Sequence, residues 1–194
     1  MARPKEFEPQ IALERAMDVF WRKGFEATSV QDLVNEMGIN RASLYSTFGD
    51  KHSLFMAALD RYSESVTGPM VEQLQAEGPA KEVISGLFRS LVGGTRASEA
   101  QPGCLMTNSA VELCQRCPET AERVTKSMER VSKGFAKVVA RGQEAGEIPT
   151  SQSPRALGRF LCGALQGLVV LSKANQSRAV LSDYVGVVLS VLET

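Results

Sequence analysis

Apolar residues recur at helical spacing along most of the chain, while the alternation typical of a half-buried strand is nearly absent. The first apolar stripe consists of Leu13, Ala16, Met17 and Phe20, and Gly24 follows it as a stop signal. Similar stripes follow without an internal repeat or a low-complexity tract. The pattern therefore predicts an all-α protein.

A second helix is expected directly after the first. Its stripe spans Val30–Met37 and ends at Gly38, a residue type favoured just past a helix end. Thr28 lies three residues before Gln31, which is the spacing of a capping box. We therefore expect Thr28 to cap the second helix.

A third, short helix is expected to begin after Asn40, a residue type that favours the N-cap. Leu44 and Phe48 are one helical turn apart and predict its inner side, together with Val30 and Leu33 of the second helix. Two short helices joined by a tight glycine turn have the spacing of a helix-turn-helix.

Longer helices with short loops are expected in the remainder of the chain. Their predicted ranges are Lys51–Ala76 (kinked or split at Gly68-Pro69), Ala80–Ala97, Cys104–Gln115, Pro118–Ala145, Pro154–Ala174 and Ser177–Glu193. The last two are apolar on more than one face, and such helices usually serve an interface as well as a core. The residues expected at a homodimer interface are Leu157, Leu161, Leu165, Leu168, Tyr184 and Val188.

The charge balance excludes a protein that binds nucleic acid non-specifically through a large net positive charge. The chain carries 22 basic and 22 acidic residues, and residues 1–62 carry eight basic and nine acidic ones. Positive charge is local: Ile39–Leu54 holds Arg41 and Lys51 against Asp50, and the Met1–Lys5 arm adds two more. Nucleic-acid binding with modest salt dependence is therefore expected.

No run approaches the length of a membrane span, and the N-terminus lacks the apolar segment of a secretory signal. These features predict a cytoplasmic protein with no membrane partner.

The third helix has an outer side that suits the major groove of duplex DNA. With Leu44 and Phe48 turned inward, the outer residues are Arg41, Ala42, Ser43, Tyr45 and Ser46. Small residues with one arginine and one tyrosine fit a groove about 12 Å wide. Thr28, Ser29 and Lys51 begin the flanking helices, where free amides suit phosphate oxygens. Asn40 completes the set of expected DNA contacts.

These residues resemble the N-terminal signature of the TetR/AcrR family of repressors. The resemblance covers about Leu13–Leu59 and consists of Phe20-Trp-Arg-Lys-Gly-Phe, Thr28-Ser-Val, Met37-Gly-Ile-Asn, Leu44-Tyr45, Phe48 and Lys51. Ser46-Thr47 stands where the family often has histidine or an aromatic residue. The resemblance implies a helix-turn-helix head over residues 1–52 and a helical ligand-binding and dimerisation body over residues 53–194. It also implies a dimer that binds a palindromic operator in double-stranded DNA and is released by a small-molecule inducer.

The body is expected to hold the inducer pocket, with Cys104 near its rim. The residues expected to line it are Phe88, Met106, Asn108 and Met128. Gly103-Cys-Leu, Asn108 and Glu112 resemble a family branch that includes electrophile-responsive repressors. The start of a helix favours the thiolate, so Cys104 is expected to react before Cys114 and Cys117, placed near the end of the same helix. The alternative is that Cys104 only lines the body.

Two other functions remain open at this stage. One is a thiol or redox enzyme that uses Cys114 and Cys117, although a thioredoxin-like motif needs a βαβ context. The other is a helical module that binds proteins through its C-terminal helices. One Cys-x-x-Cys pair with a single histidine, His52, falls short of the four ligands of a structural zinc. We therefore expect no metal, no cofactor and no catalytic residues.

Overall fold

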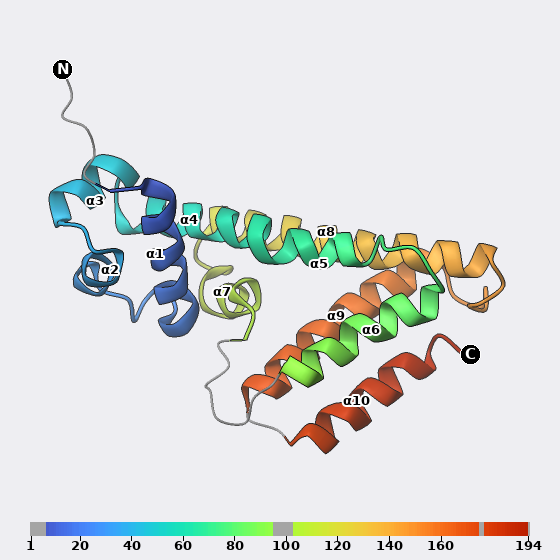
Figure 1. The fold of residues 1–194 in the computed structure, drawn as a ribbon. Coiled ribbons are helices and arrows are strands. Elements are labelled where there is room, and N and C mark those ends of the chain that lie inside the picture. The colour runs from blue at the N-terminus through green and yellow to red at the C-terminus, as the bar shows by residue number, and fades with distance from the viewer. Residues whose placement is uncertain (1–6, 95–102, 175–176, 194) are drawn as a thin grey trace. The chain divides into compact units, whose positions relative to one another are not determined.

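The computed structural model of the protein describes residues 7–94, 103–174 and 177–193, and within these ranges it holds helices and no strand (Figure 1). The predicted all-α class is confirmed. The Met1–Lys5 arm lies outside the described residues. The contacts divide the chain into two compact units. The first unit comprises the described residues up to Ser65 together with Leu105–Val124, and the second comprises the remaining described residues.

The first unit is built around four N-terminal helices and one later helix. They are α1 (Pro9–Lys23), α2 (Val30–Met37), α3 (Arg41–Phe48), α4 (Lys51–Tyr62) and α7 (Leu105–Leu113). Helix α1 packs against α2 and α4, and α3 contacts the same two helices. Phe20, Leu33, Leu44 and Phe55 are fully buried in this core. The predicted inward positions of Leu33 and Leu44 are thus confirmed, while Val30 and Phe48 are half-buried.

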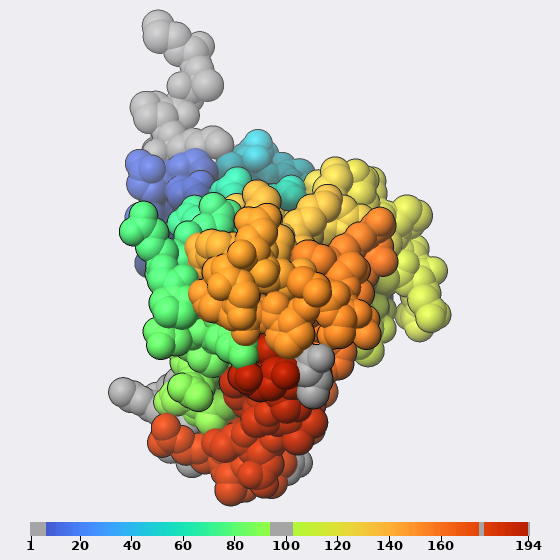
Figure 2. All heavy atoms as spheres, turned by 90° about the vertical axis from the view of Figure 1, so that its right-hand side faces the viewer, coloured from blue at the N-terminus to red at the C-terminus, as the bar shows by residue number. Residues whose placement is uncertain are grey.

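The second unit contains α5 (Gly68–Gln73), α6 (Ala80–Gly94), α9 (Pro154–Lys173) and α10 (Arg178–Ser190). The long helix α8 (Pro118–Glu144) begins in the first unit and continues into the second. Helix α10 packs against α6 and α9, and Figure 2 shows it, in red, at the surface beside the orange loop that joins α8 to α9. Phe88 and Phe135 are fully buried, with ring centroids 6.0 Å apart.

The expected helix over Lys51–Ala76 is interrupted. A π-helical turn, Ser63–Thr67, separates α4 from α5. Pro69 in the first turn of α5 lacks an amide hydrogen, so it cannot donate to the carbonyl four residues earlier. A local widening of the helix accommodates this loss. The expected split near Gly68-Pro69 is confirmed, with the irregular turn just before it.

Helix α9 is long and apolar enough, by length and composition, to cross a membrane. Its burial indicates another role. Leu157, Leu161, Leu165 and Leu168 are buried in the core of the second unit. We therefore interpret α9 as a core helix whose opposite face is exposed.

Candidate nucleic-acid interface

The turn between α2 and α3 is set by local chemistry. Gly38 ends α2 with φ 67° and ψ 31°, the left-handed conformation that a glycine adopts without strain, and its amide donates to the Val34 carbonyl. Asn40 then caps α3, because its side-chain oxygen accepts a hydrogen bond of 2.8 Å from the Ser43 amide. The predicted cap at Asn40 is confirmed, and the two helices are joined as in a helix-turn-helix.

The outer face of α3 is exposed as expected. Arg41, Ala42, Tyr45 and Ser46 are exposed, Tyr45 to 49%, while Ser43 is half-buried. The Arg41 guanidinium reaches Gln31 of α2 at 3.4 Å, so both side chains lie on one surface. At 1.5 Å per residue, the eight residues of α3 span about 12 Å, which suits entry into a major groove.

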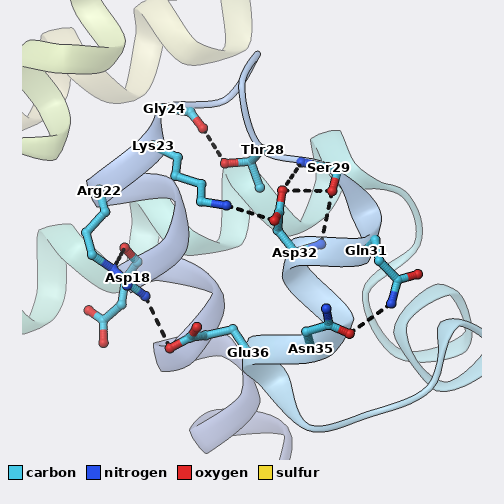
Figure 3. A network of polar contacts seen from close by, with 10 residues as sticks. All are labelled: Asp18, Arg22, Lys23, Gly24, Thr28, Ser29, Gln31, Asp32, Asn35 and Glu36. Carbon is cyan, nitrogen blue, oxygen red and sulfur yellow. Dashed lines mark hydrogen bonds and ion pairs between the residues drawn. The ribbon is translucent and has the colours of Figure 1, made fainter.

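Helix α2 is capped by Ser29 rather than by Thr28 (Figure 3). The Ser29 hydroxyl accepts from the Asp32 amide at 3.0 Å, and the Asp32 carboxylate accepts from the Ser29 amide at 2.9 Å. Thr28 is only 1% exposed, and its hydroxyl donates to the Gly24 carbonyl. The predicted cap at Thr28 is therefore wrong. The Thr28 hydroxyl closes the α1–α2 loop and is not accessible to a phosphate. Ser29 takes its place as the cap of α2.

Ion pairs join α1 to α2 beside this cap, as Figure 3 shows. Lys23 Nζ donates to the Asp32 carboxylate at 2.7 Å, and Arg22 pairs with Glu36 at 3.1 Å. The Lys23 ammonium, helped by Ser29, holds the pKa of Asp32 well below its ordinary range. Asp32 therefore stays ionised at neutral pH, so its charge and its capping bonds persist at the start of α2.

Helix α4 begins with a cap of the same kind. The Asp50 carboxylate accepts a 2.7 Å hydrogen bond from the Ser53 amide, which lowers the pKa of Asp50. The next residue, Lys51, is half-buried, and its Nζ lies 4.4 Å from the centre of the Phe25 ring. This cation–π contact holds the ammonium group at the start of α4.

Glu112, which the sequence marked only through its resemblance to a family branch, has a structural role. Glu112 of α7 accepts hydrogen bonds from the Phe25 amide at 3.0 Å and the Glu26 amide at 2.8 Å. A Cβ at Gly24 (φ 82°) would lie 2.8 Å from the same carboxylate. The carboxylate thus holds the α1–α2 loop from a point 86 residues away in sequence. No local pattern marks such a contact.

The cysteines differ from the expected arrangement. Cys104 directly precedes α7, as predicted, and is half-buried. Cys117, however, is not at the end of that helix: its carbonyl accepts from the Ala121 amide, so it is the N-cap of α8. Its Sγ lies 3.3 Å from His52 Nε2. The Thr120 hydroxyl first, and His52 second, lower the pKa of Cys117 to about 7. The predicted placement of Cys117 is therefore wrong.

We expect Cys117 to be the first cysteine alkylated at pH 7. About half of Cys117 is thiolate at pH 7, against about 1% of a thiol with an ordinary pKa near 9, so the thiolate fraction is about fiftyfold higher. A thiolate of lower pKa is also a weaker nucleophile, which lowers its reaction rate about tenfold. The net rate should be about fivefold above that of an ordinary thiol. Burial raises the pKa values of Cys114 and Cys162, so both should react slowly.

Mass-mapped alkylation with limiting iodoacetamide tests this order. The rate at Cys117 should rise with a midpoint near pH 7, because the thiol faces the Thr120 hydroxyl and His52 and its thiolate is favoured there. The Cys117→Ser variant should lose the fast phase. Faster labelling of Cys104 than of Cys117 in the wild-type protein would reverse the assignment.

Of the five residues expected to bind a ligand, one, Met128, lies in the wall of a groove that the structure describes. Met106 and Asn108 belong to the first unit, whereas Phe88, Cys104 and Met128 belong to the second. Phe88 and Met106 are 0% and 3% exposed, so their side chains are taken up by packing. Met128 lines a groove of about 600 Å³ between α8 and α9, and the other four residues are not among its lining. That all five residues line one ligand pocket stays a prediction.

The residues expected at the dimer interface are turned into the chain's own core. Leu157, Leu161, Leu165, Leu168 and Val188 are at most 6% exposed and belong to the core of the second unit. Tyr184 is half-buried and donates its hydroxyl to the Ala164 carbonyl at 3.0 Å. The five buried side chains are therefore not free to form an interface, while the prediction for the half-buried Tyr184 stays a prediction. The second apolar face of these helices, which motivated the predicted interface, consists of other residues: Phe160, Val170, Val180 and Val187.

The fold of the first unit and the exposed face of α3 define a helix-turn-helix DNA-binding protein. Comparison with known proteins agrees. Residues 12–58 match the family described as bacterial regulatory proteins, tetR family, and residues 80–185 match the family described as tetracyclin repressor-like, C-terminal domain. The chain belongs to the TetR family and is a DNA-binding transcriptional regulator. Neither family description is that of an enzyme, and the thiol-enzyme alternative finds no support.

Individual relatives cover nearly the whole chain. The HTH-type transcriptional regulator YezE of Bacillus subtilis is 35% identical over 194 residues, 100% of both chains. The HTH-type transcriptional repressor ComR of Escherichia coli is 29% identical over 96% of this chain and 90% of its own. Among solved structures, a cysteine mutant of the TetR-family regulator CifR in complex with 26-bp operator DNA is 28% identical, with a TM-score of 0.84 over 98% of this chain and 100% of its own.

Proposed function

We propose that the protein is a homodimeric transcriptional repressor that binds an inverted-repeat operator in the cytoplasm and is released by a small-molecule ligand. The observation that carries the proposal is the exposed face of α3, held by a confirmed helix-turn-helix. The similarity to ComR, named a repressor, and to CifR, solved with operator DNA, supports it. Functionally, residues 1–52 form the DNA-binding head and residues 53–194 the body.

The contacts to DNA divide into two kinds. Arg41, Ala42, Ser43, Tyr45 and Ser46 meet base edges in the major groove. Ser29, Asn40 and Lys51 lie at the starts of α2, α3 and α4, where the first-turn amides that the caps leave without an intrahelical acceptor suit phosphate oxygens. Phosphate contacts position the protein, and base contacts specify the sequence.

Removing the Arg41 or the Tyr45 side chain should weaken binding to the cognate operator. Arg41→Ala or Tyr45→Ala should each cost about 1–3 kcal/mol where the side chain contacts a base. Selection from a random DNA pool followed by titration of the selected site provides the measurement. Arg89→Ala, an exposed arginine of α6 in the second unit, is the matched control and should bind like the wild type. Unchanged affinity in both head variants would remove α3 as the recognition helix.

The dimer surface is formed by the outer faces of α9 and α10. Their exposed apolar side chains are Phe160, Val170, Val180 and Val187. On α9, Phe160 and Val170 lie on one helical stripe with Gly163, above which there is open space. Helices α9 and α10 pack against each other, and exposed apolar residues on such neighbouring helices are typical of protein interfaces. A pair of such chains presents two α3 helices to two half-sites.

The groove between α8 and α9 is the proposed ligand site. Its size is within the range of small-molecule pockets, about 300–1,000 Å³. Met128 and Cys162 give it an apolar wall, and their backbone and thiol are in contact at 3.5 Å. Arg155 and Arg159 add positive charge, while Lys133 is paired at 3.0 Å with Glu129, which also lines the groove. This combination suits a small ligand with an apolar body and an anionic group.

A further inference from the structure

A histidine, a cysteine and a glutamate meet within the first unit at a place that the DNA-binding function does not use. His52 is the second residue of α4, Cys117 is the N-cap of α8, and Glu119 is the second residue of α8. Their ligand atoms all lie within 4.8 Å of one another. His52 Nε2 is 3.3 Å from Cys117 Sγ and 3.2 Å from a Glu119 carboxylate oxygen.

The spacing of these atoms matches the coordination shell of a small metal ion. With zinc–nitrogen and zinc–oxygen bonds of about 2.1 Å and a zinc–sulfur bond of about 2.3 Å, two ligand atoms on a tetrahedron lie about 3.4–3.6 Å apart. The two distances from Nε2 are within a few tenths of an ångström of this value. The sulfur and the carboxylate oxygen, which lie within 4.8 Å of each other, need to close to this separation for all three atoms to bind one ion.

Hydrogen bonds from a neutral His52 cannot satisfy both Cys117 and Glu119 at the same time. One Nε2 atom faces both a sulfur and a carboxylate, and the single proton that it carries in one neutral tautomer serves one of them at a time. Cys117, the N-cap, and Glu119, in the first turn, sit at the N-terminal end of a 27-residue helix, where the helix dipole favours their anionic forms.

We infer that His52 Nε2, Cys117 Sγ and the Glu119 carboxylate form a binding site for a divalent cation of the zinc type, with water as the fourth ligand. A thiolate and an imidazole select zinc-like ions over magnesium or calcium, which prefer oxygen ligands. The His52 and Glu119 side chains are 38% and 62% exposed, so an ion and a water molecule have access. The ion ties the start of α4, next to Lys51, to the start of α8.

Cobalt titration of the reduced, chelator-treated full-length protein tests the site, because a thiolate bound to Co²⁺ gives a charge-transfer absorption band that water and carboxylates do not give. One equivalent of Co²⁺ should produce this band, and Zn²⁺ should displace it. Cys117→Ser should abolish the band, and His52→Gln should weaken Co²⁺ binding at least tenfold. Circular dichroism checks that each variant is folded.

Cys114 provides the matched control. It lies three residues from Cys117, is also half-buried, and is not part of the cluster. Cys114→Ser should therefore keep the band, and Zn²⁺ should protect Cys117 but not Cys114 from iodoacetamide. Absence of the band in the wild-type protein, or an undiminished band in Cys117→Ser, overturns the inference. No DNA is present in these measurements, so their outcome is independent of the proposed repressor function.

Discussion

A negative charge at Val187 is expected to abolish dimerisation and, with it, tight operator binding. Val187 is 72% exposed on α10, so Val187→Glu leaves the core of the chain intact. Burying an unpaired carboxylate at an interface is costly. A separated protomer reaches one half-site, and losing the second contact point lowers the affinity about 10²–10⁴-fold. Sedimentation velocity at micromolar concentration and operator titration measure the two effects.

Val111→Glu is the control for this experiment. Val111 is an exposed valine, at 87%, on α7, which belongs to the first unit, whereas α9 and α10 belong to the second. The same substitution there should leave the sedimentation coefficient and the operator affinity unchanged. Charges at Leu165 or Val188 are less informative, because both side chains are buried in the core of their own chain. A wild-type monomer, or a dimeric Val187→Glu protein, would reject the proposed surface.

Replacing Gly158 by alanine should destabilise the second unit by about 1–3 kcal/mol, the usual cost of overpacking. Gly158 lies where α9 crosses α8. A Cβ there would come within 2.6 Å of the Ser132 carbonyl oxygen and 2.8 Å of the Ala136 amide nitrogen. Both are backbone atoms of a long helix, so relief requires the helices to move apart. Urea unfolding followed by circular dichroism should show a lower midpoint.

Gly86→Ala is the matched control for this effect. Gly86 is exposed on α6, and a Cβ at this position meets nothing within 4 Å. Since alanine has a higher helix propensity than glycine, this variant should be neutral or more stable by up to about 1 kcal/mol. Equal midpoints for Gly158→Ala and the wild type would show that the crossing has room for a methyl group.

The DNA-binding head was predictable from the sequence because its elements are set by residues close together in the chain. A cap such as Asn40 acts on an amide three positions away, and a glycine such as Gly38 ends a helix through its own φ angle. The apolar stripes predicted α1, α2 and α3 for the same reason. Even here the prediction of Thr28 as a cap was wrong by one residue. Two pairs, Thr28 with Gln31 and Ser29 with Asp32, both have the spacing of a capping box, and the structure uses the second.

The tertiary structure alone decided which groups meet across long stretches of chain. His52 and Cys117 are 65 residues apart, and the Glu112 carboxylate binds amides 86 and 87 residues away. Likewise, α9 and α10 are apolar around much of their surface, so periodicity did not tell the buried Leu165 from the exposed Phe160. The physical reason is the same in each case. Helix formation and capping depend on neighbours within one turn, whereas the face that is buried and the side chains that meet depend on how the helices pack together.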